Sequence, residues 1–382
     1  MVRSAAAILC ALALAASALV LPDRASAAPG LLVGVDDDTV KWLAKPFGLL
    51  SVNRDLGLDA VRITIPWKRG RTKPNRLIGV YLHRVATMAG HGQRVVLAVY
   101  GRPADAPVDA RGRAQYCGFL RHVLRRIPVR DVVIWNEVNS PAYWPQQAGA
   151  PAYAALLGAC WDALHHGLAS GVNVISSTAA AHDPAGFVRD LGAAYRASGR
   201  TRPLVDTFGH NPYPLHAAEP PSTEHDDPTV VGQGDLPELL EAFRDGFGGS
   251  PQPLPGVGGT RLWYLEDGFQ TAVPSAKRHL YRGVENDRRV LPPTTDASGA
   301  LGARRDQSRQ LREALLLAYC QPAVGAFFNF ELIDEDRLGG WQSGLLWRDG
   351  TRKPAYDAFK ATVAAVKAGA VDCAQVPGAG DS

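Results

Sequence analysis

Short apolar runs alternate with segments of helical periodicity along the chain, and this alternation constrains the fold more than any other feature. The apolar runs are typical of buried parallel strands, and we place them at residues 31–35, 60–66, 94–100, 132–135, 172–177, 204–208, 260–265 and 324–330. The helical segments are at residues 40–56, 77–89, 114–127, 151–166, 184–197, 236–247, 304–320 and 354–368. Parallel strands with crossover helices in this number predict a single α/β domain, a (β/α)8 TIM barrel.

Several motifs of other α/β proteins are absent from the sequence. No GxGxxG follows the first strand, which excludes the dinucleotide fingerprint of open doubly wound sheets. There is also no GxxxxGK[ST], HExxH or GxSxG motif. The net charge is only +4 and the basic residues are scattered, so nothing indicates a nucleic-acid partner. We expect no metal, no organic cofactor and a monomeric protein.

The first 27 residues have the pattern of a secretory signal peptide. Arg3 precedes an apolar run at residues 5–21, and the small residues 25–27 resemble a signal-peptidase site. We predict cleavage there or one residue later, a secreted protein, and no membrane contact afterwards. An uncleaved N-terminal anchor is the alternative. Residues 28–368 then form the barrel, and residues 369–382 are expected to be a disordered tail.

Four cysteines follow the signal segment: Cys117, Cys160, Cys320 and Cys373. An even number in a secreted chain allows disulfides, with three possible connectivities. Cys117 and Cys160 lie in the helices on either side of the strand at 132–135, which would bring them close. We therefore predict Cys117–Cys160 and Cys320–Cys373, with free buried thiols as the alternative. No CxxC spacing indicates zinc or thiol redox chemistry.

Three of the predicted strands run into carboxylates, and one of them is the strand at 324–330, which continues into Glu331 and Asp334. The strand at 132–135 continues into Asn136 and Glu137, and the strand at 260–265 continues into Glu266. Active sites of such barrels lie at the C-terminal ends of the strands. Two facing carboxyl groups, one protonated and one ionised, are the minimum equipment for cleaving a glycosidic bond. The alternative is that Glu137 merely begins a solvated loop.

The segments Trp135-Asn136-Glu137 and Leu-Glu-Asp-Gly-Phe-Gln-Thr at 265–271 together resemble the clan of retaining glycoside hydrolases that includes family 5 cellulases and family 39 xylosidases. The resemblance implies that Glu137 is the acid/base and Glu266 the nucleophile, with their carboxyl groups about 5 Å apart. It also implies that Asn136 binds a sugar hydroxyl and that Arg62 supports the charge of the nucleophile. Pairing of Arg62 with Asp59 only is the alternative.

The same resemblance extends to the end of the sixth strand, with a departure. His210 and Tyr213 match the His-Pro-Tyr motif of the clan, in which the Tyr hydroxyl contacts the nucleophile. Here Asn211 is inserted, which leaves open which side chain points inward. His210 as a hydrogen-bonded core residue is the alternative.

Aromatic residues near the strand ends are candidates for stacking on sugar rings. The clan often has Trp at the end of the eighth strand, where this chain has Phe330, so the platform is expected to be Phe or Trp341. Trp67 and Tyr100 are further candidates, with a place in the core or at the rim as the alternative. Asp267 is expected to point away from Glu266, because neighbouring strand residues face opposite sides.

These features predict a secreted retaining β-glycosidase that hydrolyses oligo- or polysaccharides. A sugar-binding barrel without catalysis is one alternative, and a transglycosylase with the same residues is another. The sequence does not name the sugar or the linkage. Long loops after the sixth and seventh strands favour a walled pocket, and with it short substrates or exo action.

Overall fold

The chain forms one curled parallel sheet. The computed structural model describes residue 28 and residues 30–43, 47–168, 171–257, 259–285 and 306–379, so the predicted signal peptide lies outside the described residues. The strands are β1 (Leu32–Asp36), β2 (Ala60–Pro66), β3 (Arg94–Tyr100), β4 (Asp131–Ile134), β5 (Asn173–Ile175), β6 (Thr178–Ala179), β7 (Phe208–Asn211), β8 (Leu262–Asp267) and β9 (Val324–Phe330). They follow the order β5-β4-β3-β2-β1-β9-β8-β7-β6, with every pairing parallel.

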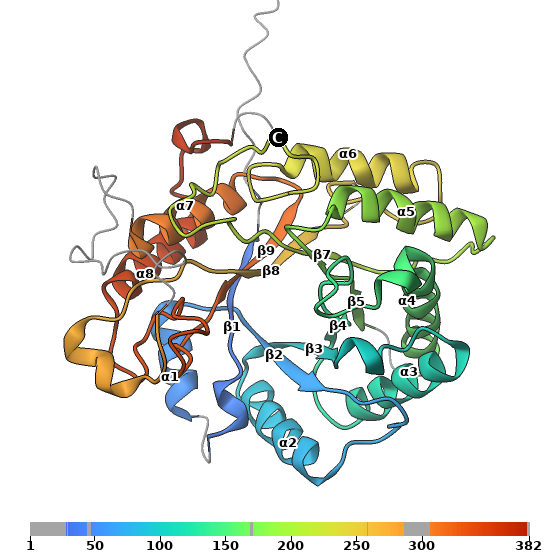
Figure 1. Cartoon of the computed structure of the whole chain (residues 1–382), viewed down its shortest axis with the longest axis horizontal. Helices are drawn as coiled ribbons and strands as arrows, with labels where there is room; N and C mark the ends of the chain where they lie inside the picture. The colour runs from blue at the N-terminus through green and yellow to red at the C-terminus, as the bar shows by residue number, and fades with distance from the viewer. Residues whose placement is uncertain are drawn as a thin grey trace, which may run out of the picture.

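Helices surround this sheet on its outside (Figure 1). The α-helices of the described residues are α1 (Phe47–Leu56), α2 (Arg76–Gly90), α3 (Ala110–Leu124), α4 (Gly149–His165), α5 (Pro184–Ala197), α6 (Leu236–Phe247), α7 (Gln307–Tyr319) and α8 (Pro354–Lys367). Short 3-10 helices are η1 (Thr39–Lys41), η2 (Pro103–Asp105), η3 (Gln146–Ala148), η4 (Ser275–Leu280) and η5 (Cys373–Gln375). Within the described ranges, no helix has the length and apolar character needed to cross a membrane.

Two layers of apolar side chains pack on the two faces of the sheet. Along β3, Val95, Leu97 and Val99 belong to the large cluster shared with the helices, whereas Val96 and Ala98 belong to a smaller cluster. Because successive strand residues face opposite sides, the smaller cluster lies on the inner face of the curl. The strands are thus buried on both faces, which explains why they are nearly continuous apolar runs.

The predicted ranges of β2, β3, β9, α5 and α6 match those observed, but the predicted strand at 204–208 is displaced. The strand instead spans Phe208–Asn211. The backbone N–H groups of Leu204 and Val205 donate to Oε1 of Gln252, at 2.7 and 3.2 Å, rather than to a neighbouring strand. A side chain distant in sequence therefore delays the start of β7. The predicted helix at 40–56 is likewise divided, into η1 and α1.

The predicted fifth strand at 172–177 is shorter than expected, since only β5 (Asn173–Ile175) lies in that range, and β6 follows beyond it. The N–H of Ser177 donates to the hydroxyl of Tyr153 at 3.2 Å, so the ladder is interrupted there. β5 pairs with β4, and β6 pairs with β7. Ile175 in β5 also forms a single parallel bridge with Thr207, next to β7.

Both predicted disulfides are confirmed. Cys117 in α3 bonds Cys160 in α4, with Cα atoms 4.9 Å apart. Cys320, at the end of α7, bonds Cys373, with Cα atoms 5.4 Å apart. Each bond closes a long stretch of chain, with sequence separations of 43 and 53 residues. Such bonds stabilise a fold mainly by restricting the unfolded chain.

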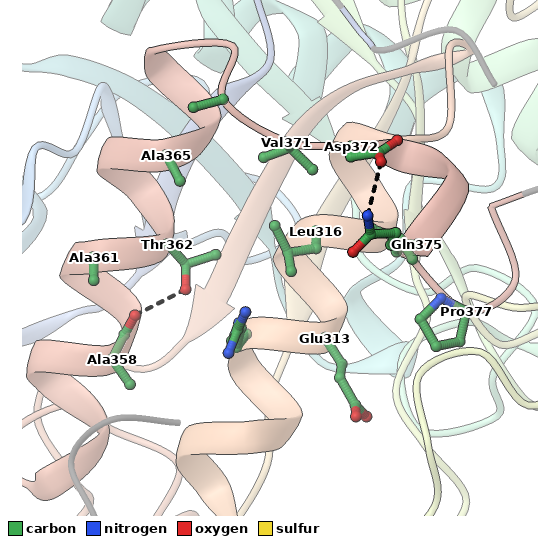
Figure 2. Close-up of a pocket in the computed structure, with 13 residues that line it drawn as sticks. Glu313, Leu316, Ala358, Ala361, Thr362, Ala365, Val371, Asp372, Gln375 and Pro377 are labelled. Carbon is green, nitrogen blue, oxygen red and sulfur yellow. Dashed lines mark hydrogen bonds between the residues drawn. The ribbon is translucent and has the colours of Figure 1, made fainter. Parts of the chain in front are cut away.

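The segment after α8 differs from the expected disordered tail as far as residue 379. It contains η5, and Cys373 is buried where it bonds α7. A groove of about 440 Å³ lies between α7, α8 and this segment. Figure 2 shows Leu316, Ala361, Ala365 and Val371 among the residues that line it. The cross-link to α7 explains why a Gly/Ala-rich end keeps a defined place.

Removal of the Cys320–Cys373 bond is expected to weaken the fold. The double variant Cys320→Ser, Cys373→Ser should lose about 2–4 kcal/mol of unfolding free energy, because its unfolded chain regains loop entropy. Urea denaturation followed by tryptophan fluorescence measures this loss, with the wild-type chain as the reference. An unchanged midpoint and slope would contradict the expectation.

Candidate active site

A buried arginine joins three strand ends. Arg62 in β2 is fully buried, and its Nη1 contacts a carboxylate oxygen of Asp36 in β1 and Oε1 of Glu266 in β8, the latter at 2.7 Å. Its Nη2 donates to Oδ1 of Asn136, which follows β4, at 2.9 Å. Burial lowers the pKa of Arg62, but the carboxylates of Asp36 and Glu266 outweigh burial and raise this pKa above its usual value. The alternative partner, Asp59, instead accepts from Lys367.

Glu266 is held on both of its oxygens. Arg62 contacts Oε1, and the hydroxyl of Tyr213 donates to Oε2 at 3.1 Å. Burial and the charge of Glu266 raise the pKa of Tyr213 well above its usual value, so its hydroxyl keeps its proton. A cation and a hydroxyl donor are the contacts that an ionised carboxylate accepts.

The chain turns sharply after β4, at the Trp-Asn-Glu segment. Trp135 and Glu137 have φ angles of 66° and 39°, in the left-handed region that non-glycine residues rarely adopt. The turn is secured because the N–H of Trp135 lies 3.1 Å from the Tyr116 hydroxyl and the N–H of Glu137 lies 3.2 Å from the Ser177 hydroxyl. Such backbone conformations persist only where the surroundings hold them, and they cluster at functional sites.

The carboxyl group of Glu137 favours the protonated form. Burial and the negative charge of Glu266 raise the pKa of Glu137 to about 7, against the opposing influence of Asn211 and Arg62. The Asn211 amide donates to Oε1 of Glu137 at 2.9 Å. A carboxyl group with this pKa can donate a proton near neutral pH, and Glu137 lies in the same cleft as the ion-paired Glu266.

Glu137 and Glu266 line one cleft, which has a volume of about 480 Å³. Aromatic side chains from different elements also line it, including Tyr213, Phe330 and Trp341. The ring of Trp341 lies 4.9 Å from that of Tyr213 and 5.3 Å from that of Phe330. Trp341 thus supplies a tryptophan to the cleft, close to the end of β9.

The structure does not bring every predicted site residue to the cleft. Trp67 is buried, packs edge-on against Trp135 and donates from Nε1 to the carbonyl of Arg71 at 2.9 Å. Tyr100 is half-buried and packs edge-on against Tyr143, with ring centres 5.5 Å apart. Trp67 therefore belongs to the core, and Tyr100 lies against a residue that lines the cleft.

His210 is a hydrogen-bonded core residue rather than a group of the cleft. Its Nδ1 lies 2.9 Å from the hydroxyl of Thr178, and its Nε2 lies 2.9 Å from the carbonyl of Val231. Burial lowers the pKa of His210 to about 4, so the ring is neutral. The question left open by the inserted residue is answered, because Asn211 reaches Glu137 and Tyr213 reaches Glu266.

Several residues of the site were not predicted from the sequence, among them Asp36, Asn211 and Tyr143. Asp36 and Asn211 were visible only as the end of a strand and as an insertion in a motif. Tyr143 carried no signal, since its place at the cleft depends on how the loop after β4 folds back. Asp267 was expected to point away from Glu266. It is buried, and burial raises its pKa well above the usual value. Burial and the charge of Asp267 raise the pKa of Tyr264, which belongs to the large apolar cluster shared with the helices.

The chain was compared with known proteins. No protein-family model and no curated protein matches it. Among solved structures, a family 39 glycoside hydrolase from Bacteroides cellulosilyticus WH2 aligns with a TM-score of 0.57 and 15% identity, over 83% of this chain and 60% of the other. A glucosidase from Croceicoccus marinus aligns with a TM-score of 0.58 and 12% identity, over 88% and 67%.

A third solved structure is a GH5_18 protein from Streptomyces cattleya in complex with GlcNAc. It aligns with a TM-score of 0.54 and 15% identity, over 90% of this chain and 81% of the other. The present chain spans less than two thirds of the length of the family 39 protein. At these identities the likeness establishes the fold, a TIM-barrel-like arrangement of strands and helices that the chain shares with glycoside hydrolases.

Proposed function

We propose that this protein is a secreted retaining β-glycosidase. One observation carries the proposal: Glu137, with a pKa raised to about 7, shares a cleft with Glu266, which is bound by Arg62 and Tyr213. Retaining glycosidases need one protonated and one ionised carboxyl group about 5 Å apart in one site. The two disulfides are compatible with an oxidising compartment outside the cytosol.

The reaction proceeds in two displacements. In the first, a carboxylate oxygen of Glu266 bonds the anomeric carbon, the bond to the leaving oxygen breaks, and the Glu137 proton passes to that oxygen. In the second, Glu137 takes a proton from water, the water oxygen bonds the anomeric carbon, and the ester to Glu266 breaks. Both carboxyl groups end in their starting states, and the sugar keeps its β configuration.

The residues around the carboxylates have assignable contacts to the sugar. Oδ1 of Asn136 accepts from Arg62, so we assign its Nδ2 group to a sugar hydroxyl. Trp341 is the proposed stacking platform, since its side chain lines the cleft. We also propose that β5 and β6 are two halves of one strand, so that the bridge from Ile175 to Thr207 closes an eight-stranded barrel.

The test is a panel of substrates, followed by determination of which anomer of the product is released first. We expect release of 4-nitrophenol from at least one of the β-D-glucoside, galactoside, xyloside, mannoside and N-acetylglucosaminide, with β-glucan, xylan, mannan and galactan as polymer substrates. Proton NMR during early hydrolysis should show the β anomer first. Appearance of the α anomer first would overturn retention, and binding of oligosaccharides without any product would favour a sugar-binding barrel.

The activity is expected to fall on the alkaline side of neutrality. Glu137 must carry its proton in the first displacement, and burial raises its pKa to about 7. The value of kcat/KM should therefore decline about tenfold per pH unit above about pH 7, because the fraction of protonated Glu137 declines in that proportion. Initial rates from about pH 4 to pH 9 measure this limb. An alkaline limb with a midpoint near the ordinary pKa of glutamate would contradict the assignment.

A further inference from the structure

The buried ion pair of the nucleophile has a third member. Arg62 lies between two carboxylates, Asp36 and Glu266, and the same Nη1 atom contacts both. Asp36 and Arg62 are also register partners on β1 and β2. The side chains of all three residues are at most 9% exposed. Two carboxylates therefore share a single cation that is shielded from water.

The proposed reaction changes the charge of this cluster. When Glu266 becomes an ester, it loses its negative charge and no longer forms an ion pair with Arg62. A buried cation without a partner is strongly destabilising, because neither water nor an opposite charge compensates for it. The Arg62 guanidinium is too basic to release its proton instead. The glycosyl-enzyme therefore needs a second carboxylate beside Arg62.

We propose that Asp36 is the positioning residue that keeps Arg62 paired while Glu266 is esterified. This inference rests on the proposed function. It gives Asp36, which is not among the residues that line the cleft, a role in the step in which Glu266 is esterified. Asp36 makes formation of the glycosyl-enzyme less costly. With Asp36 present, Arg62 keeps one of its two carboxylate partners when Glu266 is esterified; without Asp36, Arg62 would lose its only carboxylate partner. It does not contact the sugar, and it acts through Arg62.

The groups around Asp36 decide how readily it carries a negative charge. Burial and the charges of Glu266 and Asp38 raise the pKa of Asp36 well above its usual value, against the opposing influence of Arg62. The charge of Asp36 is also felt by Glu331 after β9 and by the hydroxyls of Tyr143 and Tyr213. Esterification of Glu266 removes one of the influences that raise this pKa. Asp36 is therefore a better counterion in the intermediate than in the free enzyme.

The variant Asp36→Asn tests this role by separating the two displacements. Its glycosyl-enzyme should form about 100-fold more slowly than that of the wild type, since Arg62 is then left unpaired. The probe is the 2,4-dinitrophenyl 2-deoxy-2-fluoro-β-glycoside of the panel sugar that the wild-type chain hydrolyses fastest, with labelling followed by intact mass. Release of the trapped sugar should be no slower than in the wild type, because regained charge on Glu266 restores a partner to Arg62.

Asp37→Asn is the matched control. Asp37 is also buried, but it accepts from the backbone N–H groups of Leu332 and Ile333, both at 3.0 Å. It should reduce stability without separating labelling from release. Asp36→Glu restores the charge, and it should label within about tenfold of the wild type. This second variant also serves if Asp36→Asn does not fold.

The outcomes distinguish this inference from the proposed function. If the wild type labels and Asp36→Asn labels as fast, Asp36 has no such role. If Asp36→Asn slows labelling and release equally, its role is structural and the inference is overturned. If the wild-type chain neither hydrolyses the panel nor becomes labelled, the proposed function fails and this inference falls with it.

Discussion

Replacement of Glu266 by glutamine is expected to reduce turnover by about 10⁴-fold or more, in a protein that still folds. Glutamine has nearly the same shape and can remain close to Arg62 and Tyr213, which now hold the carboxylate. Its neutral amide is a poor nucleophile, so the first displacement stops. Steady-state rates on the best 4-nitrophenyl β-glycoside measure the loss, and a urea midpoint near that of the wild type establishes that the fold remains.

The adjacent carboxylate provides the control for this variant. Asp267 also lies in β8 and is buried, but burial favours its neutral form, which asparagine resembles. Asp267→Asn should keep the activity within about threefold of the wild type, in the range of ordinary substitutions outside a site. Near-normal hydrolysis by Glu266→Gln, or an equal loss in both variants, would refute the role of Glu266 as nucleophile.

The strands that match their predicted ranges are those whose bounds are determined by their own local sequence. β2, β3 and β9 are mostly apolar runs buried on both faces, interrupted only by single polar residues such as Arg62 and Asn329, so their pattern and their ends leave little choice. β5 and β7 differ because distant side chains intervene. The hydroxyl of Tyr153 and the amide of Gln252 take backbone N–H groups that strand pairing would otherwise use. Periodicity carries no information about such partners.

The site shows the same division between local and distant causes. Glu137 and Glu266 could be predicted because each directly follows or ends an apolar strand. The choice between His210 and Asn211 depends on the register of β7, since a shift of one residue exchanges the two faces of a strand. The partnership of Asp36 with Glu266 depends on how tightly the sheet curls, because β9 lies between β1 and β8. Neither quantity is encoded in the spacing of apolar residues.

Replacement of Glu137 by alanine is expected to slow hydrolysis in a way that depends on the leaving group. General acid catalysis contributes about 10²–10⁴-fold, so a phenyl β-glycoside should lose activity within that range. The leaving group of a 2,4-dinitrophenyl glycoside is dinitrophenolate, which departs without a proton. The first displacement of this substrate should therefore be much less affected. The second displacement also loses its base, and the glycosyl-enzyme should accumulate as a burst of dinitrophenol.

A small anion provides a test of the same variant that a folding defect cannot imitate. Azide needs no general base, and it fits the space that the Glu137 side chain vacates in the cleft. It should restore turnover of the dinitrophenyl substrate and give the β-glycosyl azide, because attack on the ester inverts the anomeric carbon a second time. Glu241→Ala, on the exposed face of α6, should neither lose activity nor respond to azide. Rates that fall equally for both leaving groups, with no response to azide, would show that Glu137 is not the acid/base.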